Sequence, residues 1–276
     1  MTDFTDLESL AVSIDGHVAT VELLGPGKGN AMGPSFWEET PGVFQSLDEM
    51  DDIRAVIVRG RGDNFSYGLD MKATSQELMP KISGNNLAKE RTELRDLIHD
   101  WQQAFTSIAE CRKPVIAAID GWCIGGGVNM IAACDIRVCT DDAKFSLREP
   151  RIAITPDVGA LQRLPDIIGE GATRLMAFTA GDYDADFALE VGLVERVFDD
   201  REALDEGVAD ITSEIAANAP LAVQGAKQVL NYCKDATEEA GLEYVATWNS
   251  AFLQSQDLGE AFAAFAQGRD PEYKGE

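Results

Sequence analysis

The residues best suited to chemistry follow a short apolar run, Val115–Ile119, which is typical of a strand buried on both faces of a sheet. Three consecutive glycines, Gly125 to Gly127, then open the segment 128–134, whose small and apolar residues recur at helical spacing. Glycines let a ligand approach the backbone, and the first N–H groups of a helix have no partner inside it, so this turn can bind an oxyanion or a phosphate. The simpler alternative is a tight, closely packed turn, but three glycines exceed what such a turn needs.

Two acids, Glu149 and Asp157, follow the glycines and are separated by eight positions. From residue type alone, each can be a solvated surface acid, because most acidic side chains lie in water and this chain has 48 of them. A role in proton transfer therefore needs a further argument.

The bulk properties of the chain exclude several classes of function. Its 276 residues can form one large domain or two small ones, and the 45% hydrophobic content is typical of a globular protein. No apolar run is long enough to span a membrane, and the acidic start does not resemble a secretory leader, which predicts a cytoplasmic protein. The formal net charge of −25 would repel nucleic acid and anionic membranes, so neither is an expected partner.

The cysteines and histidines give no indication of a metal site. Five cysteines without a C-x-x-C pair are interpreted as reduced thiols, most of them small core residues. With two histidines in the chain, a histidine-rich zinc site is not expected. We therefore expect no metal and no separate cofactor.

The first half of the chain alternates predicted strands and helices. Two runs of alternating apolar and polar residues across Asp15-Gly16 predict a β-hairpin. In chain order the predicted elements are the hairpin at 10–14 and 18–24, a helix at 37–50 interrupted by Pro41-Gly42, a buried strand at 55–59, an irregular polar segment at 73–92 that would form a mobile flap or a pocket wall, and a helix at 93–109 with one apolar stripe.

The second half continues with strands and then becomes helical. Strands at 136–139 and 144–147 are followed by a segment at 152–164, by helices from Gly171 onward and by a short strand at 194–198. Strand, helix and strand recur in an order that favours an α/β fold with right-handed crossovers. The aromatic residues of the helical C-terminal third are predicted to belong to the core, with a subunit interface as the second interpretation. They include Tyr244, Trp248, Phe252, Phe262 and Phe265.

Three motifs in sequence order resemble the crotonase, or enoyl-CoA hydratase/isomerase, superfamily: Asn30-Ala31-Met32, Phe65-Ser66-Tyr67-Gly68-Leu69-Asp70 and Ile124-Gly125-Gly126-Gly127. Within it, the segments 157–165 and 246–257 most resemble the dienoyl-CoA isomerases. The resemblance covers nearly the whole chain and implies an α/β spiral of strand-strand-helix (ββα) turns. It also implies a core at 1–200 that carries an acyl-CoA site, a helical region at 201–276 for oligomerisation and active-site closure, and a homotrimer or dimer of trimers.

The resemblance assigns chemistry to the glycine turn and the two acids. It places an oxyanion hole at the backbone N–H groups of Leu69 and Gly126, which would stabilise a thioester enolate. It makes Glu149 and Asp157 the proton carriers, one near the carbonyl and the other further along a conjugated chain. Ser66 is not interpreted as a nucleophile, because Asn64 stands where the elbow motif G-x-S-x-G needs glycine.

Asn129 departs from the family pattern. Hydratases of the superfamily have a glutamate there and dienoyl-CoA isomerases an aspartate, whereas an amide cannot be a general base. Activation of water by two carboxylates is therefore in doubt, but Asn129 can still donate a hydrogen bond that orients Glu149 or the substrate. Isomerisation survives this loss better than hydration does.

Binding of the CoA moiety by so acidic a chain requires local contacts. The basic candidates are Lys28, Lys72 and Lys227, of which Lys72 directly follows the oxyanion motif; a solvated surface charge is the alternative for each. The resemblance adds the remaining candidates for contacts with the adenine and thioester portions: Asn30, Ala31, Met32, Tyr67, Gly68, Asp70, Met71 and Gly125.

The sequence thus predicts an acyl-CoA double-bond isomerase that acts on a 3,5-dienoyl or 3-enoyl thioester, with CoA as part of the substrate. Two alternatives stay open. One is an enoyl-CoA hydratase that uses Glu149 alone, and the other is a non-catalytic acyl-CoA binding protein, which Asn129 would suit. Asp157 distinguishes them, because only the isomerase uses it.

Overall fold

The computed structural model, which describes residues 4–83 and 87–276, contains two β-sheets within those residues. The larger sheet has the order β1-β2-β3-β4-β6-β9, with β1 and β2 antiparallel and the other neighbours parallel. Its strands are β1 (Leu10–Asp15), β2 (Val18–Leu23), β3 (Ala55–Gly60), β4 (Val115–Ile119), β6 (Ile136–Thr140) and β9 (Arg196–Phe198). The smaller sheet, in the order β5-β7-β8, contains β5 (Trp122–Ile124), β7 (Lys144–Ser146) and β8 (Tyr183–Asp184).

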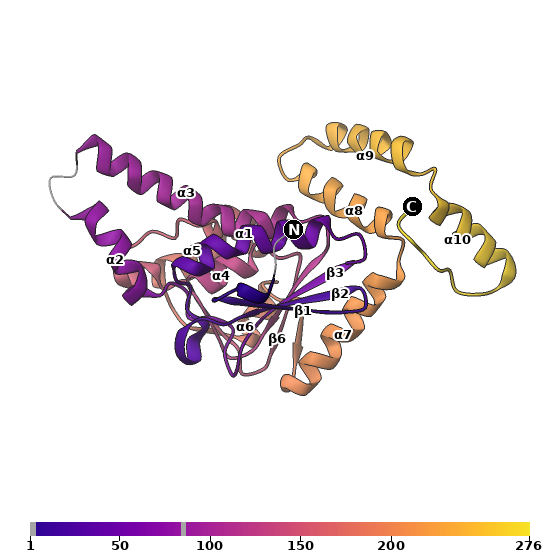
Figure 1. Cartoon of the computed structure of the whole chain (residues 1–276). Helices are drawn as coiled ribbons and strands as arrows, with labels where there is room; N and C mark the ends of the chain where they lie inside the picture. The colour runs from indigo at the N-terminus through magenta and orange to yellow at the C-terminus, as the bar shows by residue number, and fades with distance from the viewer. Residues whose placement is uncertain (1–3, 84–86) are drawn as a thin grey trace.

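Helices surround the two sheets (Figure 1). They are α1 (Pro34–Glu49), α2 (Met71–Ile82), α3 (Ala88–Glu110), α4 (Gly126–Ile131), α5 (Ala160–Thr179), α6 (Ala185–Glu190), α7 (Arg201–Ala217), α8 (Pro220–Cys233), α9 (Glu238–Phe252) and α10 (Gln256–Gln267). Strands β4 and β5 lead into α4, and β6 and β7 lead through the short helix η3 (Glu149–Ile152) into α5. This succession of a strand in each sheet and then a helix confirms the predicted α/β spiral of ββα turns.

The predicted hairpin and the predicted buried strands are confirmed. Strands β1 and β2 pair from Leu10 opposite Leu23 to Asp15 opposite Val18, and Gly16 adopts the positive φ of 54° that the tight turn requires. All five residues of β4 are buried. Removing a valine or isoleucine side chain from water contributes about 1.5–3 kcal/mol, so β4 fixes the centre of the larger sheet next to the glycine turn.

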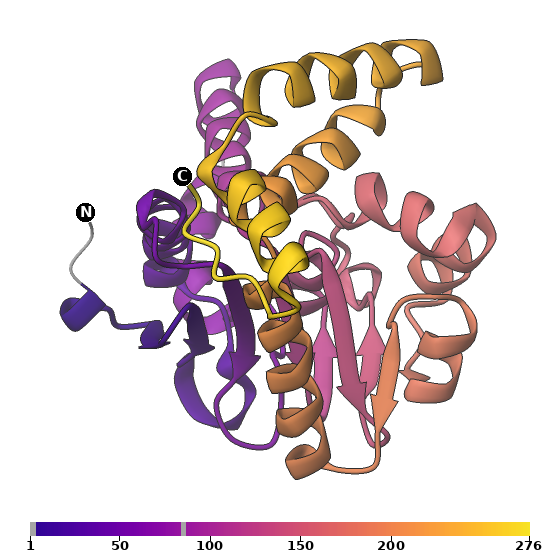
Figure 2. The same cartoon turned by 90° about the vertical axis from the view of Figure 1, so that its right-hand side faces the viewer.

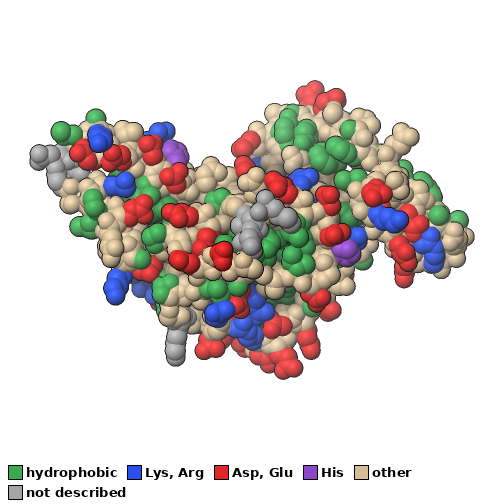
Figure 3. All heavy atoms as spheres, viewed as in Figure 1, with side chains coloured by type: hydrophobic (Ala, Val, Ile, Leu, Met, Phe, Trp, Pro, Cys, Tyr) green, Lys and Arg blue, Asp and Glu red, His purple; other side chains and the backbone are tan. Residues whose placement is uncertain are grey.

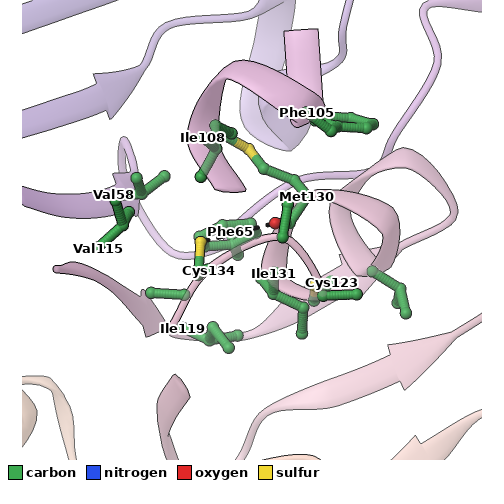
Figure 4. Packing of buried hydrophobic residues seen from close by; sticks show 14 of the residues in the cluster. Val58, Phe65, Phe105, Ile108, Val115, Ile119, Cys123, Met130, Ile131 and Cys134 are labelled. Atoms are coloured by element: carbon green, nitrogen blue, oxygen red, sulfur yellow. Dashed lines mark hydrogen bonds between the residues drawn. The ribbon is translucent and has the colours of Figure 1, made fainter. Parts of the chain in front are cut away.

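One apolar cluster combines side chains of α1, α3 and α4 with those of the neighbouring strands. Figure 4 shows part of it, in which Phe105 and Ile108 of α3 lie near Met130 of α4. Helix α3 contributes the predicted stripe, of which Trp101, Phe105 and Ile108 are buried. Trp101 stacks on Trp37 of α1 at a ring-centroid distance of 5.3 Å. Cys134 lies in the same cluster, and burial raises the pKa of its thiol to about 12, as expected of a small core residue.

Two predictions about the first half are wrong. Helix α1 continues through Pro41, because the burial of Trp37, Val43 and Phe44 on either side outweighs a cost of about 3 kcal/mol for an internal proline. The segment 73–92 is not irregular where it is described, since α2 and the first turn of α3 occupy it. Asp70 caps α2 by accepting hydrogen bonds from two backbone N–H groups, at 3.0 and 2.9 Å, and Thr74 is the one buried residue of this polar helix.

The C-terminal helices α8, α9 and α10 extend to one side of the sheets (Figures 1 and 2). Helices α8 and α9 contact each other through Tyr232 and Tyr244, whose ring centroids lie 4.2 Å apart. The prediction that the aromatic residues here are core is wrong for Phe252 of α9 and for Phe262 and Phe265 of α10, which are 45%, 69% and 88% exposed.

Candidate active site

The backbone N–H groups of Leu69 and Gly126 donate no hydrogen bond within residues 4–83 and 87–276. A short parallel bridge to Met32 aims the first of them: Met32 donates to the Gly68 carbonyl at 2.7 Å, and Asp70 donates to the Met32 carbonyl at 2.9 Å. The N–H of Leu69, between these two bonds, therefore points away from Met32. Gly126 is the first residue of α4, so its N–H has no acceptor inside the helix.

These two donors meet because glycine occupies both approaching segments. A Cβ atom on Gly68 would lie 2.8 Å from the Gly126 nitrogen and 2.6 Å from the Ile124 oxygen, and Gly68 has a φ of 77°. A Cβ atom on Gly126 would lie 2.8 Å from the sulfur of Met32. Larger residues would separate the two N–H groups, so the close approach explains the glycines that the sequence shows.

Ser66 holds the Leu69 loop in place, a role that sequence reasoning missed. Its Oγ donates to the Asn30 carbonyl at 2.8 Å and accepts from the Gly68 N–H at 3.0 Å. Asn30, which is buried, in turn donates from Nδ2 to the carbonyl of Asn64 at 2.8 Å. The position of Ser66 in an elbow-like motif drew attention to it, but only the structure shows that its hydroxyl is occupied by loop contacts.

Glu149, the first residue of η3, lies beside the same glycine turn. A Cβ atom on Gly125, where φ is 52°, would be 3.6 Å from the Glu149 carboxyl carbon. Asn129 Nδ2 donates to Glu149 Oε1 at 2.9 Å, whereas Oε2 is buried and has no hydrogen-bond partner among the described side chains and backbone. An unpartnered carboxyl oxygen beside two unpartnered N–H groups is the arrangement that proton transfer next to an oxyanion requires.

The surroundings of Glu149 favour its protonated form. Burial raises the pKa of its carboxyl above the ordinary 4.5, and the negative charge of Asp157 raises it further. Hydrogen bonds from its own backbone and from Asn129 act in the opposite direction. A carboxyl with a raised pKa is a better proton carrier near neutral pH than a solvated one.

Asp157 is the second acid that the structure brings to this site, because Asn129 bonds both to Glu149 and to Ala160, three residues after Asp157. Burial raises the pKa of the Asp157 carboxyl, and its charge raises the pKa of Glu149. Gln102 of α3 donates from Nε2 to the Asp157 backbone carbonyl at 2.7 Å and thereby fixes the loop without occupying the carboxylate. Nothing in the sequence singled out Gln102, because it lies among polar residues of an amphipathic helix.

The predicted CoA-binding residues divide into those that support the loops and those that are open to solvent. Asn30 and Met32 are buried, and the carboxylate of Asp70 caps α2. Ala31 lies in the loop between Asn30 and Met32, and Gly125 lies in the turn directly before α4. Tyr67 in the Leu69 loop and Met71 and Lys72 at the start of α2 are exposed and can meet a ligand. The side chain of Lys28 lies outside the described residues.

Lys227 is a buried structural residue, so it is neither the candidate for a CoA contact nor the solvated surface charge that the sequence left as alternatives. Its side chain is 7% exposed, and Nζ lies 2.6 Å from Asp135 Oδ2 and 3.0 Å from the Lys113 carbonyl oxygen. Asp135 Oδ2 also accepts from the Val115 N–H at 2.7 Å. The buried ion pair therefore ties α8 to the beginning of β4 and keeps the charge of Lys227 away from solvent.

Replacing Lys227 with methionine is expected to lower the free energy of unfolding by about 3 kcal/mol, because Asp135 would keep its charge without a partner. The partial exposure of the Asp135 side chain, 28%, places this value at the low end for a broken buried pair. Urea unfolding measures it, with the exposed Lys234→Met at the end of the same helix as the matched control. Equal stability of the two variants would show that the pair does not stabilise the fold.

No group of three or more His, Cys, Asp or Glu side chains within residues 4–83 and 87–276 could hold a metal ion. In the same ranges, no helix combines the length and the apolar character needed to cross a membrane.

Relatives of known activity match the chain from end to end. It is 44% identical to the mitochondrial Δ(3,5)-Δ(2,4)-dienoyl-CoA isomerase of Mus musculus over 95% of this chain and 81% of that protein. It is 42% identical to the peroxisomal Δ(3,5)-Δ(2,4)-dienoyl-CoA isomerase of Arabidopsis thaliana over 99% of this chain and 98% of that protein. These relatives are proteins of organelles, which contradicts the predicted cytoplasmic location; an acidic start that does not resemble a secretory leader carries no information on such routes.

The fold and the family agree with these relatives. The crystal structure of an enoyl-CoA hydratase from Bacillus anthracis superimposes with a TM-score of 0.88 at 29% identity, covering 98% of this chain and all of that one. The sequence model of the family described as enoyl-CoA hydratase/isomerase matches residues 13–276. With its loops, its glycine turn and nearly its whole length matched, this chain belongs to the enoyl-CoA hydratase/isomerase family.

Proposed function

We propose that this enzyme is an acyl-CoA double-bond isomerase that converts a 3,5-dienoyl thioester to the 2,4-dienoyl form, or a 3-enoyl thioester to the 2-enoyl form. The observation that carries the proposal is the pair of half-buried acids, Glu149 and Asp157, beside two backbone N–H groups without acceptors. The names of the relatives at 42–44% identity support the dienoyl substrate.

In the proposed mechanism the thioester oxygen accepts hydrogen bonds from the N–H groups of Leu69 and Gly126. Glu149, which lies next to Gly125, takes a proton from C2, and the negative charge moves onto the thioester oxygen. Two fixed donors stabilise this enolate by about 3 kcal/mol each in comparable sites. Asp157, further along the conjugated chain, gives a proton to C6, so the double bonds move to C2 and C4 and no atom is gained or lost overall.

Hydration is the weaker candidate because of the hydrogen bonds of Asn129. Its Nδ2 already donates to the Gly125 carbonyl and to Glu149, each at 2.9 Å, and its Oδ1 accepts from the Ala160 N–H at 2.7 Å. Little capacity remains to orient a water molecule for attack. Binding alone does not require the buried, unpartnered Oε2 of Glu149, which costs free energy in the folded protein.

For the CoA moiety we propose contacts with the exposed start of α2 and with the loop that contains Lys28, Asn30 and Ala31. Lys72 would meet a phosphate, since its side chain is exposed directly after the Leu69 loop. No separate cofactor takes part, because CoA is carried by the substrate. Acidic side chains are spread over the face shown in Figure 3, so these few lysines would provide the local attraction.

We further propose that residues 201–276 serve assembly into a homotrimer or a dimer of trimers and help to close the site. Apolar side chains gather over α8 and α9 in Figure 3. The exposed Phe262 and Phe265 of α10 add to the apolar surface of the same region. Large exposed apolar side chains of this kind are typical of subunit interfaces.

Replacing Asp157 with asparagine is expected to lower formation of the 2,4-dienoyl product about 100-fold, because no acid would then reach C6. Exchange of the C2 proton with solvent should persist, since Glu149 is unchanged. Diene absorbance measures formation of the product, and mass spectrometry of substrate incubated in D2O measures exchange of the C2 proton. Asp166→Asn, at an exposed position of α5, is the matched control. If product formation and C2-proton exchange fall equally, Asp157 takes part in the first proton transfer or supports the fold. If neither falls, Asp157 takes no part in the reaction.

A further inference from the structure

The side chain of Asn129 is fully buried, and each of its hydrogen bonds fixes its orientation. The Ala160 backbone N–H can only donate, so the atom that it meets at 2.7 Å must be Oδ1. The Gly125 carbonyl can only accept, so the atom facing it at 2.9 Å must be Nδ2. Two independent neighbours thus set the amide so that its remaining N–H points to Glu149 Oε1, at 2.9 Å.

We infer that Asn129 is a positioning residue that holds Glu149 Oε1 as a permanent hydrogen-bond acceptor and thereby assigns proton exchange with the substrate to Oε2. The inference rests on the proposed isomerase reaction. It follows from the asymmetry of the carboxyl group, of which Oε1 has a donor that cannot turn away while Oε2 is buried without a partner. A proton on Oε1 would face a hydrogen atom of the Asn129 amide, so the proton taken from the substrate stays on Oε2.

Asn129 also joins the segments that carry the two acids. It belongs to α4, it donates to η3 through Glu149, and it accepts from Ala160, the first residue of α5. Ala160 follows Asp157 by three positions, so one rigid amide spans the elements on either side of the loop between the acids. The separation of the two carboxyl groups therefore depends on Asn129 as well as on the loop itself.

An acid at this position would behave differently as the pH changes. Asn129 is neutral at every pH, so among the described residues the titratable group whose charge raises the pKa of Glu149 is Asp157. An aspartate at 129 would present oxygen to two acceptors, Gly125 O and Glu149 Oε1. It would have to carry a proton to donate even one of the two bonds, and loss of that proton would place two carboxylates in contact.

The test is the pH profile of kcat for Asn129→Asp with a 3,5-dienoyl-CoA. The wild-type rate is expected to rise through an acid limb, as Glu149 becomes ionised, and to fall through a basic limb, as Asp157 loses the proton that it must give to C6. The variant is expected to lose at least about tenfold at neutral pH and to decline further as the pH rises, with KM within about twofold of wild type. Asn218→Asp at the exposed end of α7 introduces the same charge away from the site and should leave the profile unchanged. A wild-type profile in Asn129→Asp would overturn the inference.

A measurement on the wild-type protein covers the case in which Asn129→Asp does not fold. With asparagine labelled in 15N, the side-chain amide protons of Asn129 should shift with the ionisation of Glu149, and the shift should disappear in Glu149→Gln. An amide resonance that does not respond to pH would contradict the assigned hydrogen bond. Failure of the wild-type protein to isomerise any dienoyl substrate would instead contradict the proposed function, so the two failures are distinguishable.

Discussion

Replacing Glu149 with glutamine is expected to reduce kcat for a 3,5-dienoyl-CoA by about 1,000-fold, because the amide cannot take the C2 proton. Glutamine has nearly the same shape, and its oxygen can still accept from Asn129 Nδ2. Binding of an unreactive saturated acyl-CoA should therefore stay within about threefold of wild type. Stopped-flow absorbance measures the rate, and calorimetric titration measures the binding.

The control for this variant is Glu170→Gln on α5, where the side chain is exposed and pairs only with Arg174. It removes the same charge from a surface ion pair, which contributes little to stability. Its kcat should equal that of the wild type. A Glu149→Gln protein that retains wild-type turnover would remove Glu149 from the mechanism, and one that also loses acyl-CoA binding would make Glu149 a binding residue.

Replacing Gly68 with alanine is expected to lower kcat by about 100-fold, the effect of losing one oxyanion donor. The new Cβ atom would lie 2.8 Å from the Gly126 nitrogen and 2.6 Å from the Ile124 carbonyl oxygen, so the two N–H groups could not keep their separation. The substitution changes neither acid, so only the stabilisation of the enolate is weakened. Steady-state kinetics with the dienoyl substrate measure this loss.

Gly62 supplies a control with the same backbone strain. Its φ is 74°, close to the 77° of Gly68, but a Cβ atom there would meet nothing within 4 Å. Gly62→Ala and Gly68→Ala should therefore share the cost of a positive φ, about 1–2 kcal/mol of stability, and differ in activity. If both variants lose the same activity, the effect of Gly68→Ala is backbone strain and not the separation of the two donors.

The sheets could be predicted from the sequence because each strand carries its own pattern. Val115–Ile119 is continuously apolar and is buried on both faces, while strand β2 of the hairpin alternates and has one face in the core. Helix α2 could not be predicted in this way. Its stability comes from the Asp70 cap and from packing against α3, and both depend on where α3 lies in the fold.

The glycine turn could be identified as an anion site from the residues alone, but the roles of Leu69, Glu149 and Asp157 required the family resemblance. The environment of these residues could not be predicted. Lys227 illustrates the limit: a lysine on an amphipathic helix gives no sign that Asp135, distant in sequence, will be buried beside it. The same holds for Asn129, whose departure from the family pattern was visible, whereas its three hydrogen-bond partners come from segments that only the fold brings together. The proton-transfer roles of Glu149 and Asp157 stay predictions until the variants are measured.

The central claim is double-bond migration without addition of water. The most direct test is to incubate the purified protein with a 3,5-dienoyl-CoA and, separately, with a 2-enoyl-CoA, and to follow diene absorbance together with product mass. We predict that the first substrate gives a 2,4-dienoyl product of unchanged mass and that the second gains no water. Hydration of the 2-enoyl substrate with no conversion of the dienoyl substrate would contradict the account.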